Sequence, residues 1–213
     1  LALKPKGMVR PAFLMTGMFR NTGNMGIPLM MLAYGKEVLG DIIVLFVLSN
    51  TLHFSLGIWL ISRARGAWSW LRNPNVWAGV LGLLCAPWRE QIPLFIQTSV
   101  EMLGQVSIPL MLFSLGVRMA SGRISQLGLA LRINLLYLLA GLISVALVVA
   151  VLPLSAIWIK MLVLSAALPP AVLNYLLSEQ YRTDTDTVAS VVLLGNLLAV
   201  IVMPVVIALT LIW

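Results

Sequence analysis

Seven apolar stretches, each near the length that crosses a bilayer, follow one another along this chain of 213 residues. A helix needs about 20 mostly apolar residues to span the hydrocarbon core. The stretches cover residues 11–34, 41–62, 74–88, 93–117, 127–151, 156–178 and 187–212. A segment in lipid must satisfy its own backbone hydrogen bonds, and none of the seven shows the alternating pattern of barrel strands. The sequence therefore predicts an all-α polytopic membrane protein with seven transmembrane helices.

Composition supports lipid as the natural solvent of the chain. Hydrophobic residues make up 61% and charged residues 10%, whereas soluble domains average about 45–50% and about 25%. The net charge is +7, but the basic residues stand singly or in small groups between apolar stretches. That distribution favours a topology signal and argues against nucleic acid as a partner.

The basic residues gather on one side of the predicted membrane. Cytoplasmic connections carry the excess of Lys and Arg. With the start of the chain inside, ten lie inside and three outside. The inner group is Lys4, Lys6, Arg10, Arg63, Arg65, Arg72, Arg118, Arg123, Arg132 and Arg182, and the outer group is Lys36, Arg89 and Lys160. This places the C-terminus outside. Because the chain begins at Leu1, we also expect it to be a fragment of a longer protein.

The first apolar stretch is interrupted near its middle. It holds Arg20, Asn21, Gly23, Asn24, Gly26 and Pro28. Glycine and proline interrupt the hydrogen bonds of a helix, and asparagine offers replacement partners. The sequence therefore predicts a broken helix with Arg20 near mid-membrane.

The sixth stretch is interrupted in a corresponding way by Pro169 and Pro170, with Asn174 four residues further on. Because the two interrupted stretches are five segments apart, they enter from opposite faces, as in an inverted repeat. Crossing at the midplane would bring two helix N-termini together, which favours an anion. Simple kinks are the alternative.

These interruptions belong to an ordered set of motifs that resembles the auxin efflux carrier family, which includes plant auxin carriers and bacterial permeases. The motifs are Asn21–Pro28 with Tyr34-Gly35, Asn73-Pro74 with Gly79–Gly82, Ile108–Leu110 with Ser114–Gly116, and Ala166–Pro169 followed by Tyr181, Asp184 and Pro204. The resemblance covers essentially the whole chain.

The resemblance implies a ten-helix fold of two inverted five-helix repeats, in which the fourth and ninth helices are broken and cross at the substrate site. Residues 1–62 would hold helices four and five of the transport domain, 74–117 scaffold helices six and seven, and 127–213 transport helices eight to ten. The first three helices would be missing. It also implies a bacterial cytoplasmic (inner) membrane.

The resemblance implies that Asn21 and Pro169 contact the substrate. Auxin carriers have proline where this chain has Arg20, and a polar residue where it has Pro170. The candidate substrate-binding set is Arg20, Asn21, Gly23, Asn24, Gly26, Pro28, Pro169, Pro170 and Asn174. The departures leave the solute open within the class of small organic anions.

Glu101 and Gln105 lie one turn apart on the fourth stretch and are candidates for a proton carrier or a gate, with a hydrated carboxylate as the alternative. His53 stands alone in an apolar stretch. A packed histidine is favoured there, and a proton carrier is the alternative.

No catalytic or metal-ligand constellation is visible, so we expect no enzyme activity, metal or cofactor. We expect a secondary transporter that moves a small organic anion, such as a carboxylate, by alternating access. An uncoupled facilitator or channel, and a membrane sensor or subunit, are alternatives. A homodimer is left open.

Overall fold

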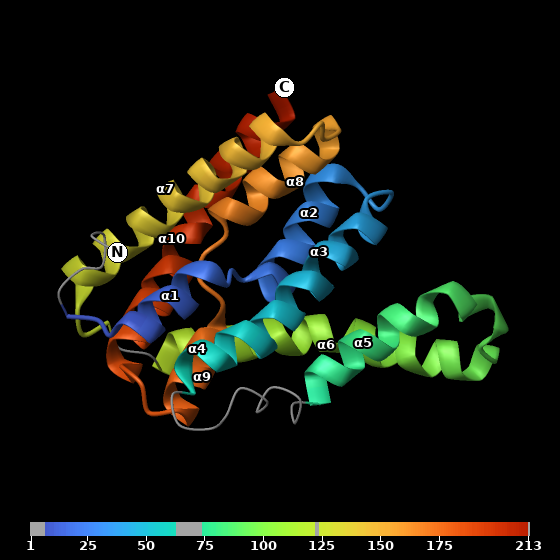
Figure 1. Ribbon diagram of the computed structural model, residues 1–213, viewed down its shortest axis with the longest axis horizontal. Coiled ribbons are helices and arrows are strands. Elements are labelled where there is room, and N and C mark those ends of the chain that lie inside the picture. Colours follow the sequence, from blue (N-terminus) through green and yellow to red (C-terminus); the bar gives the residue numbers. More distant parts are fainter. Residues whose placement is uncertain (1–6, 63–73, 122–123, 213) are drawn as a thin grey trace.

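The computed structural model describes residues 7–62, 74–121 and 124–212, and these residues form helices joined by short connections (Figure 1). In chain order the elements are α1 (Arg10–Met18), η1 (Thr22–Gly26), α2 (Ile27–Tyr34), α3 (Leu39–Leu52), η2 (His53–Gly57), α4 (Ile58–Ile61), α5 (Pro74–Cys85), η4 (Ala86–Gln91), α6 (Leu94–Ser121), α7 (Leu127–Val151), α8 (Ala156–Ala167), α9 (Val172–Gln180) and α10 (Thr185–Ile212). Elements η1 and η2 are π-helices, and η4 is a 3-10 helix. The all-α prediction is confirmed.

Within the described residues, three uninterrupted helices are long and apolar enough to cross a membrane. They are Leu39–Ile61, which joins α3, η2 and α4, together with α7 and α10. The first and sixth predicted stretches are divided into shorter helices, namely α1 with α2 and α8 with α9. A broken helix cannot be recognised as a span from the length of its pieces. The prediction of seven spans therefore stays a prediction.

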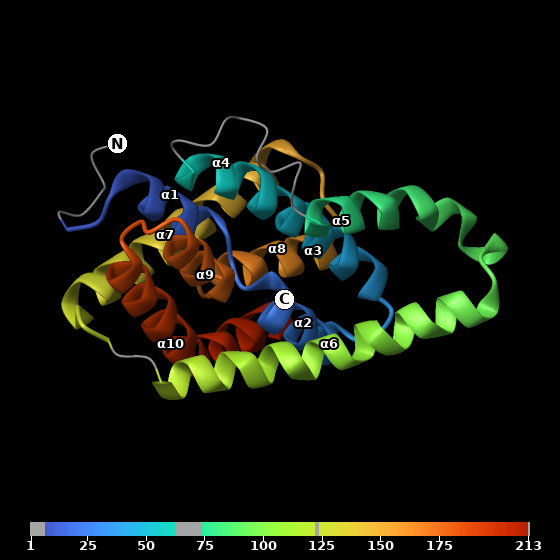
Figure 2. The ribbon, with the colours of Figure 1, turned by 90° about the horizontal axis from the view of Figure 1, so that it is seen from below.

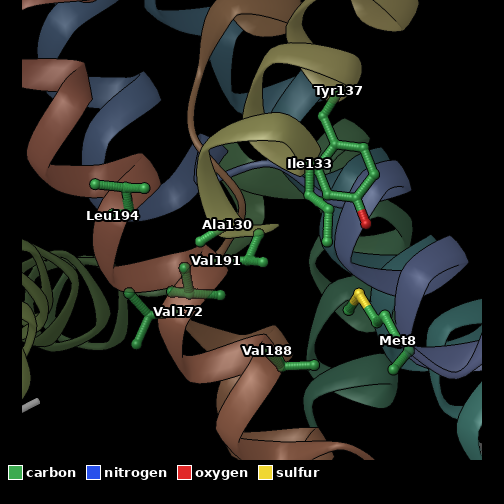
Figure 3. Packing of buried hydrophobic residues seen from close by; sticks show 10 residues of the cluster. Met8, Ala130, Ile133, Tyr137, Val172, Val188, Val191 and Leu194 are labelled. Carbon is green, nitrogen blue, oxygen red and sulfur yellow. The ribbon is translucent and has the colours of Figure 1, made fainter. Parts of the chain in front are cut away.

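Helices α7, α8 and α10 lie side by side in Figures 1 and 2, and α9 packs against α10. One buried cluster joins this group to the start of the chain through Met8, Ala130, Ile133, Val188 and Val191 (Figure 3). The outer face of α7 carries exposed apolar residues at every fourth position: Leu131, Leu135, Leu139, Ile143 and Leu147. This spacing gives one continuous apolar stripe, as expected for an integral membrane protein whose helix faces lipid.

Helices α5 and α6 form a hairpin that extends away from the other helices (Figure 2), and α6 packs against η1. Many large apolar side chains of α6 are exposed, among them Leu94, Phe95 and Phe113.

Several residues of the predicted topology lie outside the described residues, namely Lys4, Lys6, Arg63, Arg65, Arg72 and Arg123, and so does Asn73 of the family motif.

Candidate functional site: a crossing of two broken helices

The first broken segment opens at Phe19. Helix α1 ends at Met18, and Phe19 has extended backbone angles (φ −108°, ψ 113°). The chain turns helical again at Thr22, where the amides of Met25 and Gly26 both donate to the carbonyl of Asn21, at 3.2 and 3.0 Å. This wide π-helical turn leads into α2, which has Pro28 in its first turn, a position that tolerates proline.

The second broken segment opens at Leu168, which is extended (φ −54°, ψ 146°), as the residue before a proline usually is. Neither Pro169 nor Pro170 has an amide hydrogen, so neither can continue the hydrogen bonds of α8. Ala171 is also extended and begins α9.

The two openings meet. Arg20 and Pro170 form an antiparallel β-bridge. The amide of Asn21 donates to the carbonyl of Pro169 at 2.8 Å, and the amide of Ala171 donates to the carbonyl of Phe19 at 3.0 Å. Backbone groups released by each break are therefore paired by the other break, which is what irregular backbone at membrane depth requires. We call this arrangement the crossing.

Arg20 extends from the crossing toward α7 and α8. Its Nη1 donates to the carbonyl of Leu168 at 3.3 Å, and its Nη2 donates to the carbonyl of Tyr137. Its guanidinium carbon also lies 5.7 Å from the centre of the Tyr137 ring, within the range of a cation–π interaction. No carboxylate pairs with Arg20 within residues 7–62, 74–121 and 124–212.

Asn21 turns away from Arg20 toward α10. Its Nδ2 donates to Oδ1 of Asn196 at 2.8 Å. Asn196 Nδ2 in turn donates to the carbonyls of Pro170 at 3.2 Å and Val192 at 2.8 Å. Both asparagines are buried. One amide of α10 therefore holds both broken segments together, and we call this set the Asn196 clamp.

Asn174 lies in the first turn of α9 and is fully buried. Its Nδ2 donates to the carbonyl of Phe19 at 3.0 Å. Its Oδ1 makes no hydrogen bond to a described residue. Asn174 thus holds Phe19, a residue of the crossing to which the Asn196 clamp makes no hydrogen bond.

A cavity of about 630 Å³ adjoins the crossing on the side of Arg20. Its wall is mostly apolar, and it is lined by Arg10, Phe13, Leu14, Gly17, Met18, Arg20, Thr22, Leu45, Ser49, Leu136, Tyr137, Ala140, Gly141, Ser144, Val145, Leu162, Ser165 and Ala166. The hydroxyls of Thr22 and Ser49 lie 3.4 Å apart on this wall. The buried hydroxyl of Ser165 has no hydrogen-bond partner among the described residues. Two arginines and several hydroxyl side chains therefore line the same cavity.

The structure distributes the predicted binding residues over different positions. Arg20 lines the cavity, whereas Asn21, Pro170 and Asn174 are buried in the contacts that build the crossing. Pro169 lines a second cavity of about 150 Å³, which Arg20 also reaches.

The remaining predicted residues lie farther from the larger cavity. Gly23 packs close to the ring of Phe46 and Gly26 close to Leu168, so both serve close approach. Pro28 starts α2, and Asn24 in η1 is half-buried and outside the cavity wall.

Glu101 and Gln105 are not brought to the crossing. Both are exposed on α6, and Gln105 Nε2 donates to Glu101 Oε1 at 3.4 Å. Their role as a gate or proton carrier stays a prediction that this geometry does not support.

Sequence reasoning missed most of the cavity wall. Ser49, Tyr137 and Ser165 come from three different helices, and each is one of several scattered polar residues in an apolar stretch. Such residues usually serve packing in membrane helices, so no sequence signal separates them. Asn196 hydrogen-bonds to both broken segments, and no motif in its own stretch indicates this position.

Comparison with known proteins identifies the type of protein that carries this crossing. A family model described as "Membrane transport protein" matches residues 58–207, well over half of the chain. The chain belongs to the auxin efflux carrier family. The matched residues include the second broken segment and Asn196, while Arg20 lies before them.

The curated proteins that this chain resembles come from plants and bacteria. A rice (Oryza sativa subsp. japonica) protein named "Probable auxin efflux carrier component 5b" is 29% identical over 66% of this chain and 40% of its own length. A Rhizobium meliloti protein named "Putative malonate transporter" is 24% identical over 86% of this chain and 62% of its own length. The chain therefore spans less than two thirds of the length of these relatives.

Proposed function

We propose that this carrier family chain holds the substrate site of a secondary transporter, and that the substrate is a small organic anion moved by alternating access. The observation that carries the proposal is the unneutralised guanidinium of Arg20 at the crossing, which lines a cavity of about 630 Å³. A cation inside a membrane protein is costly unless a partner or a function retains it.

The donor count of Arg20 favours a bound anion. A guanidinium offers five N–H groups and accepts none. The two hydrogen bonds to the carbonyls of Leu168 and Tyr137 fix the orientation of the side chain and leave N–H groups available. A carboxylate could accept two of them side by side, which is the strongest pairing an arginine makes.

The rest of the wall suits a small carboxylate with an apolar body. The hydroxyls of Thr22, Ser49 and Ser165 can donate to carboxylate oxygens, while Phe13, Leu45 and Leu162 offer apolar surface. The names of the relatives point the same way, since an auxin efflux carrier and a malonate transporter both refer to organic acids.

Helix ends at the crossing add to the positive potential. Helix α9 begins at Val172 and η1 at Thr22, both directly after the crossing. The positive end of a helix dipole favours negative charge within its first turn. Movement of one broken segment past the other would change which side of the membrane reaches the cavity, and this is our basis for alternating access. We place the protein in a bacterial cytoplasmic membrane with its C-terminus outside.

The test is Arg20→Gln in the full-length protein, reconstituted in liposomes. Counterflow exchange of labelled malonate and indole-3-acetate is compared with that of their neutral amides. We expect apparent affinity for the acids to fall at least about tenfold, because a charge-assisted pair of about 1.5–3 kcal/mol is lost, and affinity for the amides to change much less. Arg132→Gln is the matched control, because Arg132 is an exposed arginine of α7.

Equal loss for acids and amides would refute charge pairing at Arg20. Wild-type flux that rises linearly with concentration and shows no exchange would instead identify a facilitator or channel.

A further inference from the structure

His53 is the only histidine of the chain, and it lies one helical turn beyond the larger cavity. Ser49 of the same helix lines that cavity, and residues four apart share one helix face. His53 itself is only 4% exposed and begins the π-helical turn η2, a feature that often marks functional positions.

The imidazole ring of His53 is attached to the crossing by stacking. It lies parallel to the ring of Phe19, with centroids 4.3 Å apart and planes 8° apart. At the crossing, the carbonyl of Phe19 accepts hydrogen bonds from the backbone amide of Ala171 and from Nδ2 of Asn174. Gly57 leaves room for this stack, since a Cβ there would lie 3.0 Å from both rings.

Two buried atoms near this stack lack partners and complement each other. The side chains of His53 and Asn174 are neighbours suited to a hydrogen bond. In the present geometry, however, His53 Nε2 and Asn174 Oδ1 make no hydrogen bond to any described residue. Because Asn174 Nδ2 already donates to the carbonyl of Phe19, Oδ1 remains as an acceptor. Hydrogen on Nε2, which the protonated ring always carries and the neutral ring carries in one of its two tautomers, would donate to Oδ1 and satisfy both atoms.

We propose that His53 is a proton-binding site that couples proton movement to transport of the organic anion. The inference rests on the proposed function. A proton leaves a hydronium ion of the cavity water and binds the ring nitrogen that carries no hydrogen. One N–H bond forms, one O–H bond breaks, and Nε2–H then donates to Asn174. The positive charge offsets that of the anion, so proton and anion cross together.

Access to His53 is controlled by Phe19. In this structure the ring is sealed from the cavity among apolar residues, where a lone positive charge would be costly. Any shift of the crossing moves Phe19, because its carbonyl is bonded to the second broken segment. Proton binding is therefore confined to the state in which the crossing has shifted.

Few other ionisable groups of the described residues could account for such coupling. Element η2 packs against α3, α4 and α5. In those elements Asp41 lies three turns away at the start of α3, and Cys85 is exposed at the end of α5. Tyr181 packs at the edge of the same apolar cluster. Glu179 accepts from Tyr175 on the exposed side of α9, and Arg20 is directed to carbonyls of α7 and α8.

The experiment compares wild type and His53→Gln in liposomes with labelled malonate. The external solution stays at about pH 6.5 so that malonate ionisation is constant, while the lumen is set to about pH 6.5 or about pH 8. We expect the gradient to accelerate wild-type uptake at least about fivefold, and a protonophore to remove this effect. His53→Gln should keep exchange at equal pH and lose the response to the gradient. Ser55→Ala, in the same π-helical turn, should keep both.

A gradient response that persists in His53→Gln would overturn the proposal, and so would a wild type that exchanges malonate without any gradient response. If His53→Gln does not fold, the proposal is tested on the wild type alone, with a pH-sensitive dye inside the vesicles that reports luminal pH during malonate entry. Malonate entry should acidify the lumen, and entry without acidification overturns the inference. Absence of exchange in the wild type would refute the proposed function instead.

Discussion

The two broken segments exchange backbone hydrogen bonds with each other but differ in the polar side chains they carry. The segment that breaks at Phe19–Asn21 supplies mainly donors, namely the guanidinium of Arg20 and both the amide and the side-chain Nδ2 of Asn21, while its Phe19 carbonyl accepts from Ala171. The segment that breaks at Leu168–Ala171 supplies mainly acceptors, because its prolines have no amide hydrogen and their carbonyls are left to receive.

This difference explains how the crossing is stable and polar at the same time. Each segment satisfies what the other leaves open, and Asn196 completes the set from α10. It also separates two roles that the sequence placed together. Arg20 is the donor with capacity left for a solute, while Pro170 and Asn21 are engaged with other protein groups.

The largest effect is expected from substitution of Asn196, because this side chain hydrogen-bonds to both broken segments. Asn196→Ala removes three buried hydrogen bonds and leaves Asn21 Nδ2 and the carbonyl of Pro170 without partners. Interhelical hydrogen bonds in membranes contribute about 0.6 kcal/mol each on average and leave further cost when broken. We expect the free energy of unfolding to fall by about 2 kcal/mol, measured by denaturant titration in detergent.

Leu197→Ala is the matched control, since Leu197 is the next residue and is exposed. If Asn196→Ala were as stable as this control, the clamp would not hold the two segments together.

An intermediate effect is expected from a substitution that moves Arg20 without changing its charge. Gly141 lies beside Arg20, and a Cβ there would lie 3.2 Å from Nη2 and 2.9 Å from the carbonyl of Ala166. Gly141→Ala should therefore reorient Arg20 and lower anion affinity about three- to tenfold, or about 1 kcal/mol. Ligand-induced thermal stabilisation measures this change.

Gly128→Ala on the same helix is its control, because a Cβ there meets nothing within 4 Å. Equal affinity in the two variants would show that the orientation of Arg20 does not govern anion binding.

The smallest effect is expected from a substitution in the segment that breaks at Leu168–Ala171. Pro170→Ala keeps the carbonyl that receives Asn196, so the crossing and the cavity should persist. We expect anion affinity within about twofold of wild type and a loss of stability of about 0.4–1 kcal/mol from the freer unfolded chain. Binding assays and thermal unfolding measure the two. Loss of binding at normal stability would restore Pro170 as a substrate contact, as the sequence predicted.

The sequence determined the helical class, the element order and the sites of both breaks. These depend on the length of apolar runs and on proline and glycine, whose effects are local to the backbone. The ordered motifs around Asn21 and Pro169 also indicated the family that the comparisons show.

Only the tertiary structure decided how the polar groups are used. Arg20 and Asn21 are neighbours in sequence, yet the first faces the cavity and the second faces Asn196, because extended backbone directs successive side chains to opposite sides. Ser49, Tyr137 and Ser165 line the same cavity as Arg20 and come from three helices that are separate in the chain. Such an arrangement depends on contacts between distant segments, and no pattern within one segment specifies those contacts.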